Sequence, residues 1–159
     1  METRQKILEL LFPKAVLQAM TPEARAAMPA VLQGVGMITV LAFPFRLGRE
    51  SRVMMINNTV HRIERPTAPG SVPNNDIYLL DGGKLLQVSR EHLQIDRSAD
   101  GYVLTDRGSQ CGASVNGKRI GAGTGTQSAP LHDGDLVVIG TAESCYRYTF
   151  YTDFGNTRW

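Results

Sequence analysis

After Gly34 the chain alternates between short runs of apolar and β-branched residues and short polar breaks. The breaks are rich in glycine, aspartate and asparagine, which suit the backbone angles of tight turns. Runs of this kind occur at residues 37–48, 75–80, 84–88, 92–95, 101–106, 113–117, 135–140 and 146–152. This spacing predicts a mainly β domain over residues 34–151, built as a sandwich or barrel of antiparallel strands.

Residues 3–33 have a helical pattern instead. A helix start is indicated at Thr21, whose side chain can cap, and Pro22 suits the first helical position. We therefore predict an N-terminal helical extension over residues 1–33, and a C-terminal tail over residues 152–159. Such helices could serve a membrane or a partner, but we favour their packing on the domain that follows.

Composition and charge limit the possible partners. The chain has 159 residues, of which 42% are hydrophobic, enough for one domain with a core. Its 17 Lys and Arg against 15 Asp and Glu give a formal net charge of +2. This is too small to favour nucleic acid as a partner, so any anion site must be local.

The first residues, "METRQKILELLF", contain neither the apolar core of a signal peptide nor a stretch long enough to cross a bilayer. We therefore expect a cytoplasmic location without membrane attachment. In a reducing compartment Cys111 and Cys145 are expected to be free thiols. The three histidines have no metal-ligand spacing, so no metal or cofactor is predicted.

The segment at residues 50–75 does not fit the strand pattern as a whole. Its middle could be a strand, whereas its proline-rich end is typical of a long exposed loop. Four basic or titratable side chains of this segment form either a second contact surface or a solvated loop, and we favour the solvated loop. They are Arg52, His61, Arg62 and Arg65.

The stretch "LLQVSREHLQIDR" at residues 85–97 combines residue types that hydrolytic enzymes use. A triad of Ser89, His92 and Asp106 would make this chain an enzyme. Both flanks of "SRE" are predicted to be strands, which places Ser89 and His92 at opposite ends of a short loop. Nothing in that arrangement brings the imidazole to the hydroxyl, so we expect a protein that holds a ligand without transforming it.

Four motifs occur in a fixed order along the β region. They are "FRLGRE" at 45–50, "SREH" at 89–92, "DRGSQCGASVNG" at 106–117 and "LHDGDLVVIG" at 131–140. Together they resemble the forkhead-associated (FHA) domain family over roughly residues 34–151. The resemblance implies a two-sheet antiparallel β-sandwich whose loops at one end bind phosphothreonine peptides, with no catalysis.

The resemblance also implies which residues hold the phosphate. Arg49 supplies a rigid guanidinium fork, which donates charge-assisted hydrogen bonds, and Ser89 supplies a neutral hydroxyl donor. A bound phosphate needs such donors. Arg90 either adds a donor from the same loop or is an ordinary solvated arginine. Other positions are expected to support the site without touching the ligand: Gly48, His92, Asn116 and Gly117.

One position departs from the family pattern. The family usually has an asparagine that contacts the peptide backbone beside the phosphothreonine, and this chain has Cys111, preceded by Gln110. The resemblance assigns both residues to the peptide-binding loop, where the thiol replaces a strong amide donor and acceptor. We expect a phosphothreonine-binding module of Ser/Thr kinase signalling or complex assembly. The alternative is a phosphate-independent scaffold with the same fold.

Overall fold

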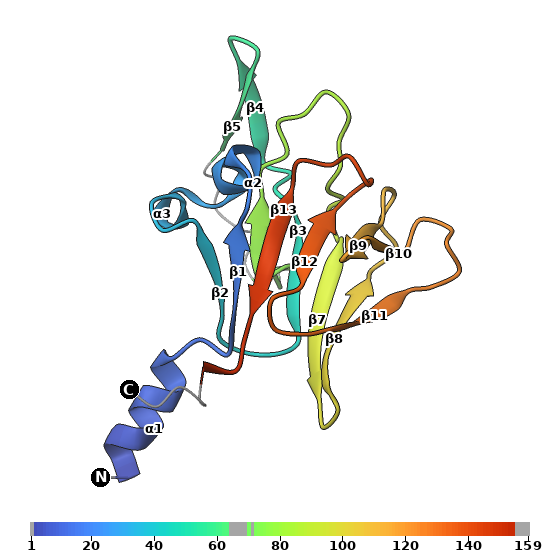
Figure 1. The fold of residues 1–159 in the computed structure, drawn as a ribbon. Coiled ribbons are helices and arrows are strands. Elements are labelled where there is room, and N and C mark those ends of the chain that lie inside the picture. Colours follow the sequence, from blue (N-terminus) through green and yellow to red (C-terminus); the bar gives the residue numbers. More distant parts are fainter. Residues whose placement is uncertain (1, 64–69, 71, 155–159) are drawn as a thin grey trace.

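The computed structural model describes residues 2–63, 70 and 72–154, and its centre is a sandwich of two β-sheets (Figure 1). In spatial order, the first sheet contains β10 (Lys118–Ile120), β9 (Ala113–Val115), β12 (Leu136–Ile139), β13 (Arg147–Tyr151), β1 (Ala15–Ala19) and β2 (Met37–Val40). The second contains β11 (Ser128–Leu131), β8 (Gly101–Asp106), β7 (Leu93–Ser98), β3 (Phe45–Arg49) and β6 (Ile77–Leu79). The predicted two-sheet sandwich is confirmed. Its strands pair antiparallel except β3 and β6, which run parallel.

The core lies between the sheets and follows the alternation of the strands. In β7, for example, Leu93 and Ile95 are buried while Gln94 and Asp96 are only half-buried. The largest fully buried aromatic side chains are Tyr148 and Phe150 of β13, the strand between β12 and β1. Because both sheets contribute to one core, the loops at each end of the sandwich are held on a rigid base.

The helical prediction for residues 3–33 is wrong at β1. This strand lies between β13 and β2, with Val16 opposite Tyr151 on one side and Thr39 on the other. Its first residues are buried, so pairing within the sheet decides its conformation over local propensity. The first sheet therefore includes residues that the sequence assigned to the helical extension.

The helices themselves differ in how they attach. Helix α2 (Pro22–Ala27) begins as predicted, with the Thr21 hydroxyl accepting from the Ala24 N–H at 3.1 Å, and its Ala24 and Ala27 are buried. A short α3 (Ala30–Gln33) follows. Helix α1 (Glu2–Leu11) extends away from the sandwich (Figure 1). Its Ile7 and Leu11 are exposed, so these two residues do not pack on the domain as expected.

Two further segments differ from expectation. Residues 84–88 form no strand: Leu85 and Leu86 are exposed in an irregular loop. Part of the 50–75 segment forms a β-hairpin of β4 (Val53–Ile56) and β5 (Thr59–Arg62), which projects from one end of the sandwich (Figure 1).

The basic residues of that segment have separate roles. Arg62 is not solvated: its guanidinium donates to the carbonyl oxygens of Ala27 at 2.8 Å and Met28 at 3.2 Å, and so attaches the hairpin to the end of α2. Arg52 forms an ion pair with the Glu50 carboxylate at 3.3 Å. His61 is exposed, as a solvated loop would have it, and Arg65 lies outside the described residues. Within the described part of the chain, no helix is long and apolar enough to cross a membrane.

Candidate functional site

Four segments meet at one end of the sandwich and form an open pocket of about 560 Å³. They are the end of β3, the segment before β6, the loop before β7 and the loop after β8. The pocket is lined by Arg49, Asn74, Leu86, Val88, Ser89, Arg90, Glu91, Arg107, Gly108 and Gln110. The sequence-predicted Arg49, Ser89, Arg90 and Gln110 therefore share one pocket.

Backbone pairing brings the end of β3 and the loop before β7 together. The Arg49 N–H donates to the Ser89 carbonyl at 2.9 Å, and the His92 N–H donates to the Leu47 carbonyl at 3.1 Å. Between these bonds, Gly48 faces the Arg90 carbonyl oxygen so closely that an added Cβ would overlap it. Glycine is therefore required at this position, because any side chain would push the "SREH" loop off β3.

His92 joins the loop before β7 to the loop after β8. Its ring is fully buried, with Nδ1 accepting from the Ser89 N–H at 2.9 Å and Nε2 lying 2.7 Å from the Gly112 carbonyl. Because Nδ1 accepts, the neutral ring carries its proton on Nε2 and donates it to Gly112. Burial lowers the pKa of His92 below its ordinary value of 6.5, more than the Gly112 hydrogen bond raises it.

A buried carboxylate shapes the loop after β8. One oxygen of Asp106 accepts from the N–H groups of Gly108 and Ser109, both at 2.9 Å, and the other accepts from the Ser109 hydroxyl. That hydroxyl in turn accepts from the Gly112 N–H at 2.9 Å. Gly112 has φ +69°, and an added Cβ would meet the Ile120 carbonyl at 2.6 Å, so the turn is fixed by its composition.

The polar side chains that face the pocket have fewer hydrogen-bond partners than these buried groups. The Ser89 hydroxyl accepts from the Gln110 N–H at 3.0 Å, which leaves its own hydrogen free to donate. Within the described part of the chain, the Arg49 guanidinium has no hydrogen-bond or ion-pair partner, although it lines the pocket. A hydroxyl and an unpaired guanidinium in one pocket are suited to binding an anion.

Sequence comparison finds a match to the FHA domain model over residues 46–140. The chain belongs to the FHA domain family. The FHA model spans all of the pocket-lining segments, from β3 to the loop after β8. Among curated proteins, a sequence comparison finds no match.

Solved structures share this FHA fold at low sequence identity. The FHA domain of an Arabidopsis thaliana hypothetical protein is 19% identical, with a TM-score of 0.53 and 94% of each chain covered. Mycobacterium tuberculosis EmbR, in complex with a low affinity phosphopeptide, is 20% identical with a TM-score of 0.52. That match covers 99% of this chain but only 30% of the EmbR chain. The FHA domain of Chlamydia trachomatis CT664 is 16% identical, with a TM-score of 0.50 and coverage of 86% and 95%. At these identities the likeness establishes the fold.

Cys111 is not among the residues that line the pocket of this FHA domain. Its thiol points to the Leu86 carbonyl oxygen at 3.5 Å, and its own carbonyl accepts from the Arg119 guanidinium at 2.6 Å. Arg119, which also donates to the Gly140 carbonyl at 2.5 Å, was not singled out from the sequence. It stabilises the turn on which Gln110 and Cys111 lie.

The turn at Asn116 and Gly117 is present between β9 and β10, but the structure does not bring it to the pocket. It lies at the opposite end of β9 from Gly112. The Asn116 side chain donates to the Asp135 carboxylate at 2.8 Å and accepts from the Leu136 N–H at 2.9 Å. Asn116 therefore stabilises the turn before β12, and β9 alone connects it to the FHA pocket.

The residues of the possible triad are held apart in this FHA domain. Both ring nitrogens of His92 are bonded to backbone groups, and neither is bonded to the Ser89 hydroxyl. The Asp106 carboxylate is bonded to Ser109 and its neighbours and does not bond His92. His92 is therefore not placed as the base that a triad would use to activate Ser89.

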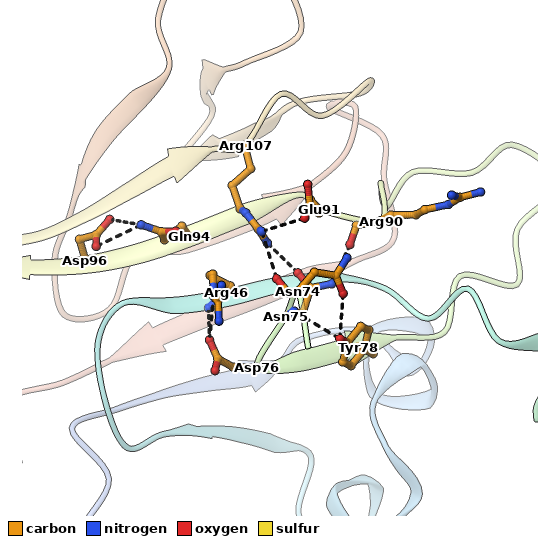
Figure 2. A network of polar contacts seen from close by, with 10 residues as sticks. All are labelled: Arg46, Asn74, Asn75, Asp76, Tyr78, Arg90, Glu91, Gln94, Asp96 and Arg107. Atoms are coloured by element: carbon orange, nitrogen blue, oxygen red, sulfur yellow. Dashed lines mark hydrogen bonds and ion pairs between the residues drawn. The ribbon is translucent and has the colours of Figure 1, made fainter. Parts of the chain in front are cut away.

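A polar network beside the pocket was missed by the sequence analysis (Figure 2). The Arg107 guanidinium donates to the Asn75 side-chain oxygen at 2.6 Å and to the Asn74 carbonyl at 3.0 Å, and lies 3.4 Å from the Glu91 carboxylate. The buried Asn75 also donates to the Arg90 carbonyl at 2.7 Å. Figure 2 shows the Arg90 side chain extending away from this network.

The loop before Ser89 rests on a second residue that was missed, Asp81. This buried carboxylate accepts from the N–H groups of Gln87 at 2.6 Å and Val88 at 2.9 Å, and from the Tyr146 hydroxyl at 2.8 Å. Asp81 belongs to "LDGG" at residues 80–83, a composition typical of a turn. Its partner Tyr146 lies far along the chain, so no local pattern indicated the contact.

Proposed function

We propose that this FHA domain binds phosphothreonine-containing proteins and does not transform them. The observation that carries the proposal is the Arg49 guanidinium, which has no partner within the described residues and shares a pocket with the Ser89 hydroxyl. In this proposal Arg49 and Ser89 hold the phosphate oxygens, with Arg90 adding charge at the rim. A phosphate carries a charge of about −2 at neutral pH and three acceptor oxygens, which suits these donors.

Local charge supports the proposal on a nearly neutral chain. Three arginines and one acid line the pocket: Arg49, Arg90, Arg107 and Glu91. The formal net charge of the whole chain is only +2, so the positive charge at the pocket is concentrated there. A cleft with an excess of one sign of charge raises the local concentration of ligands of the opposite sign.

The second part of the proposal concerns the peptide beside the phosphate. Gln110 lines the pocket and offers a side-chain amide, so we assign it a contact with the peptide backbone, with Cys111 as a weak neighbour. Gly48 and His92 hold the loops without touching the ligand. The similar EmbR chain was solved in complex with a low affinity phosphopeptide, which agrees with this type of ligand. The context we propose is cytoplasmic Ser/Thr kinase signalling or the assembly of a larger complex.

A second candidate function rests on Cys111. Its thiol is directed to the Leu86 carbonyl and does not line the pocket, so the amide that the family normally offers at this position is lost. This favours a scaffold that keeps the FHA fold and binds its partners without phosphate. The accessible Arg49 and Ser89 favour the phosphate-dependent function.

A binding screen with a phosphothreonine peptide library and its unphosphorylated counterpart tests the proposal. We expect binding only to phosphorylated peptides. By calorimetry, Arg49→Ala should weaken the best peptide by about 1.5 to 3 kcal/mol, roughly tenfold to a hundredfold, with an unchanged melting temperature. The control is Arg97→Ala, because Arg97 is exposed on β7 and lies beside the Tyr102 ring, outside the pocket. Undiminished binding by a folded Arg49→Ala variant would overturn the assignment.

A further inference from the structure

We infer that Arg107 forms a second anion subsite beside the phosphate pocket, which takes a carboxylate or a second phosphate of the same bound peptide. The inference rests on the proposed function, because the phosphothreonine must first place the peptide in the pocket. Arg107 lines that pocket together with Arg49 and Ser89. The subsite would make the domain prefer peptides with a further acidic group near the phosphothreonine.

The Arg107 guanidinium is held in a fixed orientation by neutral acceptors. Its Nη1 donates to the side-chain oxygen of Asn75 at 2.6 Å, and its Nη2 donates to the Asn74 carbonyl at 3.0 Å (Figure 2). Asn75 is itself buried and bonded to the Arg90 carbonyl, so it cannot turn away. These acceptors orient the fork without neutralising its charge, and a guanidinium has five N–H groups, of which these bonds use only part.

The anion now beside Arg107 is loosely held. The Glu91 carboxylate lies 3.4 Å from Nη2, and its side chain is 54% exposed while that of Arg107 is 16% exposed. Because the Glu91 carboxylate is already largely solvated by water, its contact with Arg107 contributes little. A peptide carboxylate or phosphate can therefore take the place of Glu91, which returns to solvent without leaving a buried charge unpaired.

Arg107 gives the subsite its selectivity for an anion, and Glu91 limits that selectivity. A neutral peptide side chain at this point cannot displace a carboxylate from Arg107, whereas an anionic one makes the same contact and is already held nearby by the phosphothreonine. Specificity is the difference in affinity between the two peptides. Glu91 competes with the anionic side chain for Arg107 and so makes that difference smaller. Arg90 is not proposed for this subsite, because its side chain extends away from the Arg107 network (Figure 2).

Synthetic peptides of fixed background test the inference by calorimetry. Each peptide has a central phosphothreonine and alanine neighbours, and one glutamate is moved through every flanking position, with a glutamine peptide as the match for each. A third set carries phosphoserine at the same positions, which separates phosphate from carboxylate as the second anion. At one or two positions we expect wild-type protein to bind the anionic peptide about fivefold tighter than its glutamine match.

The protein variants assign that ratio to a residue. Arg107→Gln should reduce the ratio to about one, and Glu91→Gln should increase it, because the anionic peptide no longer has a competitor. Arg97→Gln, on an exposed arginine outside the pocket, is the matched control and should leave the ratio unchanged. A purely structural role for Arg107 would weaken both peptides of a pair equally and would not change their ratio.

Each contrary outcome is distinct. If phosphopeptides bind but no position distinguishes glutamate or phosphoserine from glutamine, the second subsite is wrong and the proposed function stands. A ratio that survives in Arg107→Gln places the anion elsewhere and also overturns the subsite. If Arg107→Gln does not fold, the exposed Glu91→Gln variant decides, since an unchanged ratio there contradicts the exchange. If no phosphopeptide binds at all, the proposed function fails, and the subsite with it.

Discussion

The pocket loops and the β4–β5 hairpin project from the sandwich, yet they are built on opposite principles. The pocket loops are tied by buried polar groups, chiefly His92, Asp106 and Asp81, each bonded to backbone N–H or carbonyl groups. The hairpin presents four consecutive apolar residues of β4, Val53–Ile56, and all four are exposed. The conformation of the pocket loops is therefore fixed by the hydrogen bonds of buried polar side chains, and not by apolar side chains at the surface.

This difference has a consequence for binding. A site whose loops are already fixed loses little conformational entropy when a ligand arrives, so more of the contact energy appears as affinity. Among the residues that the structure describes, buried polar groups of this kind do not hold the hairpin, and the Arg62 guanidinium attaches its base to the end of α2. Substitutions in the two regions should differ accordingly in their effects on stability and on phosphopeptide affinity.

The largest expected effect is that of His92→Ala. The substitution leaves the Ser89 N–H and the Gly112 carbonyl without partners in a buried site and also creates a cavity. We expect the free energy of unfolding to fall by about 3 kcal/mol, measured by urea denaturation, with weaker phosphopeptide binding as a result. An unchanged melting temperature together with lost binding would make His92 a direct ligand instead.

A smaller effect of the same residue is expected from pH. Burial lowers the pKa of His92 in the folded state, so the unfolded chain binds more protons around its ordinary value of 6.5. This contribution to stability is therefore present above about pH 6.5 and is lost as the pH falls from there toward the lower folded pKa. Protonation of Nδ1 would also oppose the Ser89 N–H that it accepts from.

Melting temperatures measured between about pH 7.5 and pH 5 test this dependence. The exposed His61 provides the control, and His61→Gln should keep the wild-type slope. His92→Gln should have a flatter slope over the same interval, because the residue that must be neutral in the folded state is gone. Equal slopes for wild type and His92→Gln would show that carboxylates alone cause the acid sensitivity.

How much of the fold could be predicted depended on whether a pattern was local. Strands such as β7 and β8 show alternation and a turn in adjacent residues, so the sandwich was predictable. Strand β1 was not, because its conformation is set by pairing with β13 at the other end of the chain. The strand predicted at residues 84–88 was wrong for a different reason, because Leu85 and Leu86 are exposed in a loop that Asp81 holds in place.

For the candidate site too, motifs were predictable from the sequence and contacts between distant residues were not. Motif order predicted that Arg49, Ser89 and Gln110 belong to one site, and the structure brings them to one pocket. Arg107 stood inside a motif but was not assigned a role, because Asn75, its closest partner, is far from it in sequence. Asn116 was assigned to the site by its motif alone, whereas its side chain bonds to the turn before β12.

A moderate effect is expected from Cys111→Asn, which adds to the pocket end the amide that the family pattern contains. The turn is kept by Gly112 and by the Arg119 bond to the residue 111 carbonyl, so the new carboxamide should fit without moving the loop. We expect phosphothreonine-peptide affinity to rise by about 0.5 to 1.5 kcal/mol, the contribution of one net hydrogen bond. Titration of wild type and Cys111→Asn with the same phosphopeptide measures this gain in affinity. If neither protein binds any peptide of a diverse library measurably, the phosphate-independent scaffold is favoured.

The smallest effect is expected in the hairpin. Met54→Thr with Met55→Thr replaces two side chains that are 50% and 61% exposed, and threonine keeps the preference for extended backbone. Because these residues bury little surface and belong to neither pocket loop, the free energy of unfolding should change by less than about 0.5 kcal/mol. Phosphopeptide affinity should stay within error of wild type.

Urea denaturation and calorimetry on one preparation measure both quantities, with His92→Ala as the contrasting variant. A loss of stability above about 1 kcal/mol would mean that β4 is packed more tightly than its exposure indicates, and the contrast between hairpin and pocket would then be wrong.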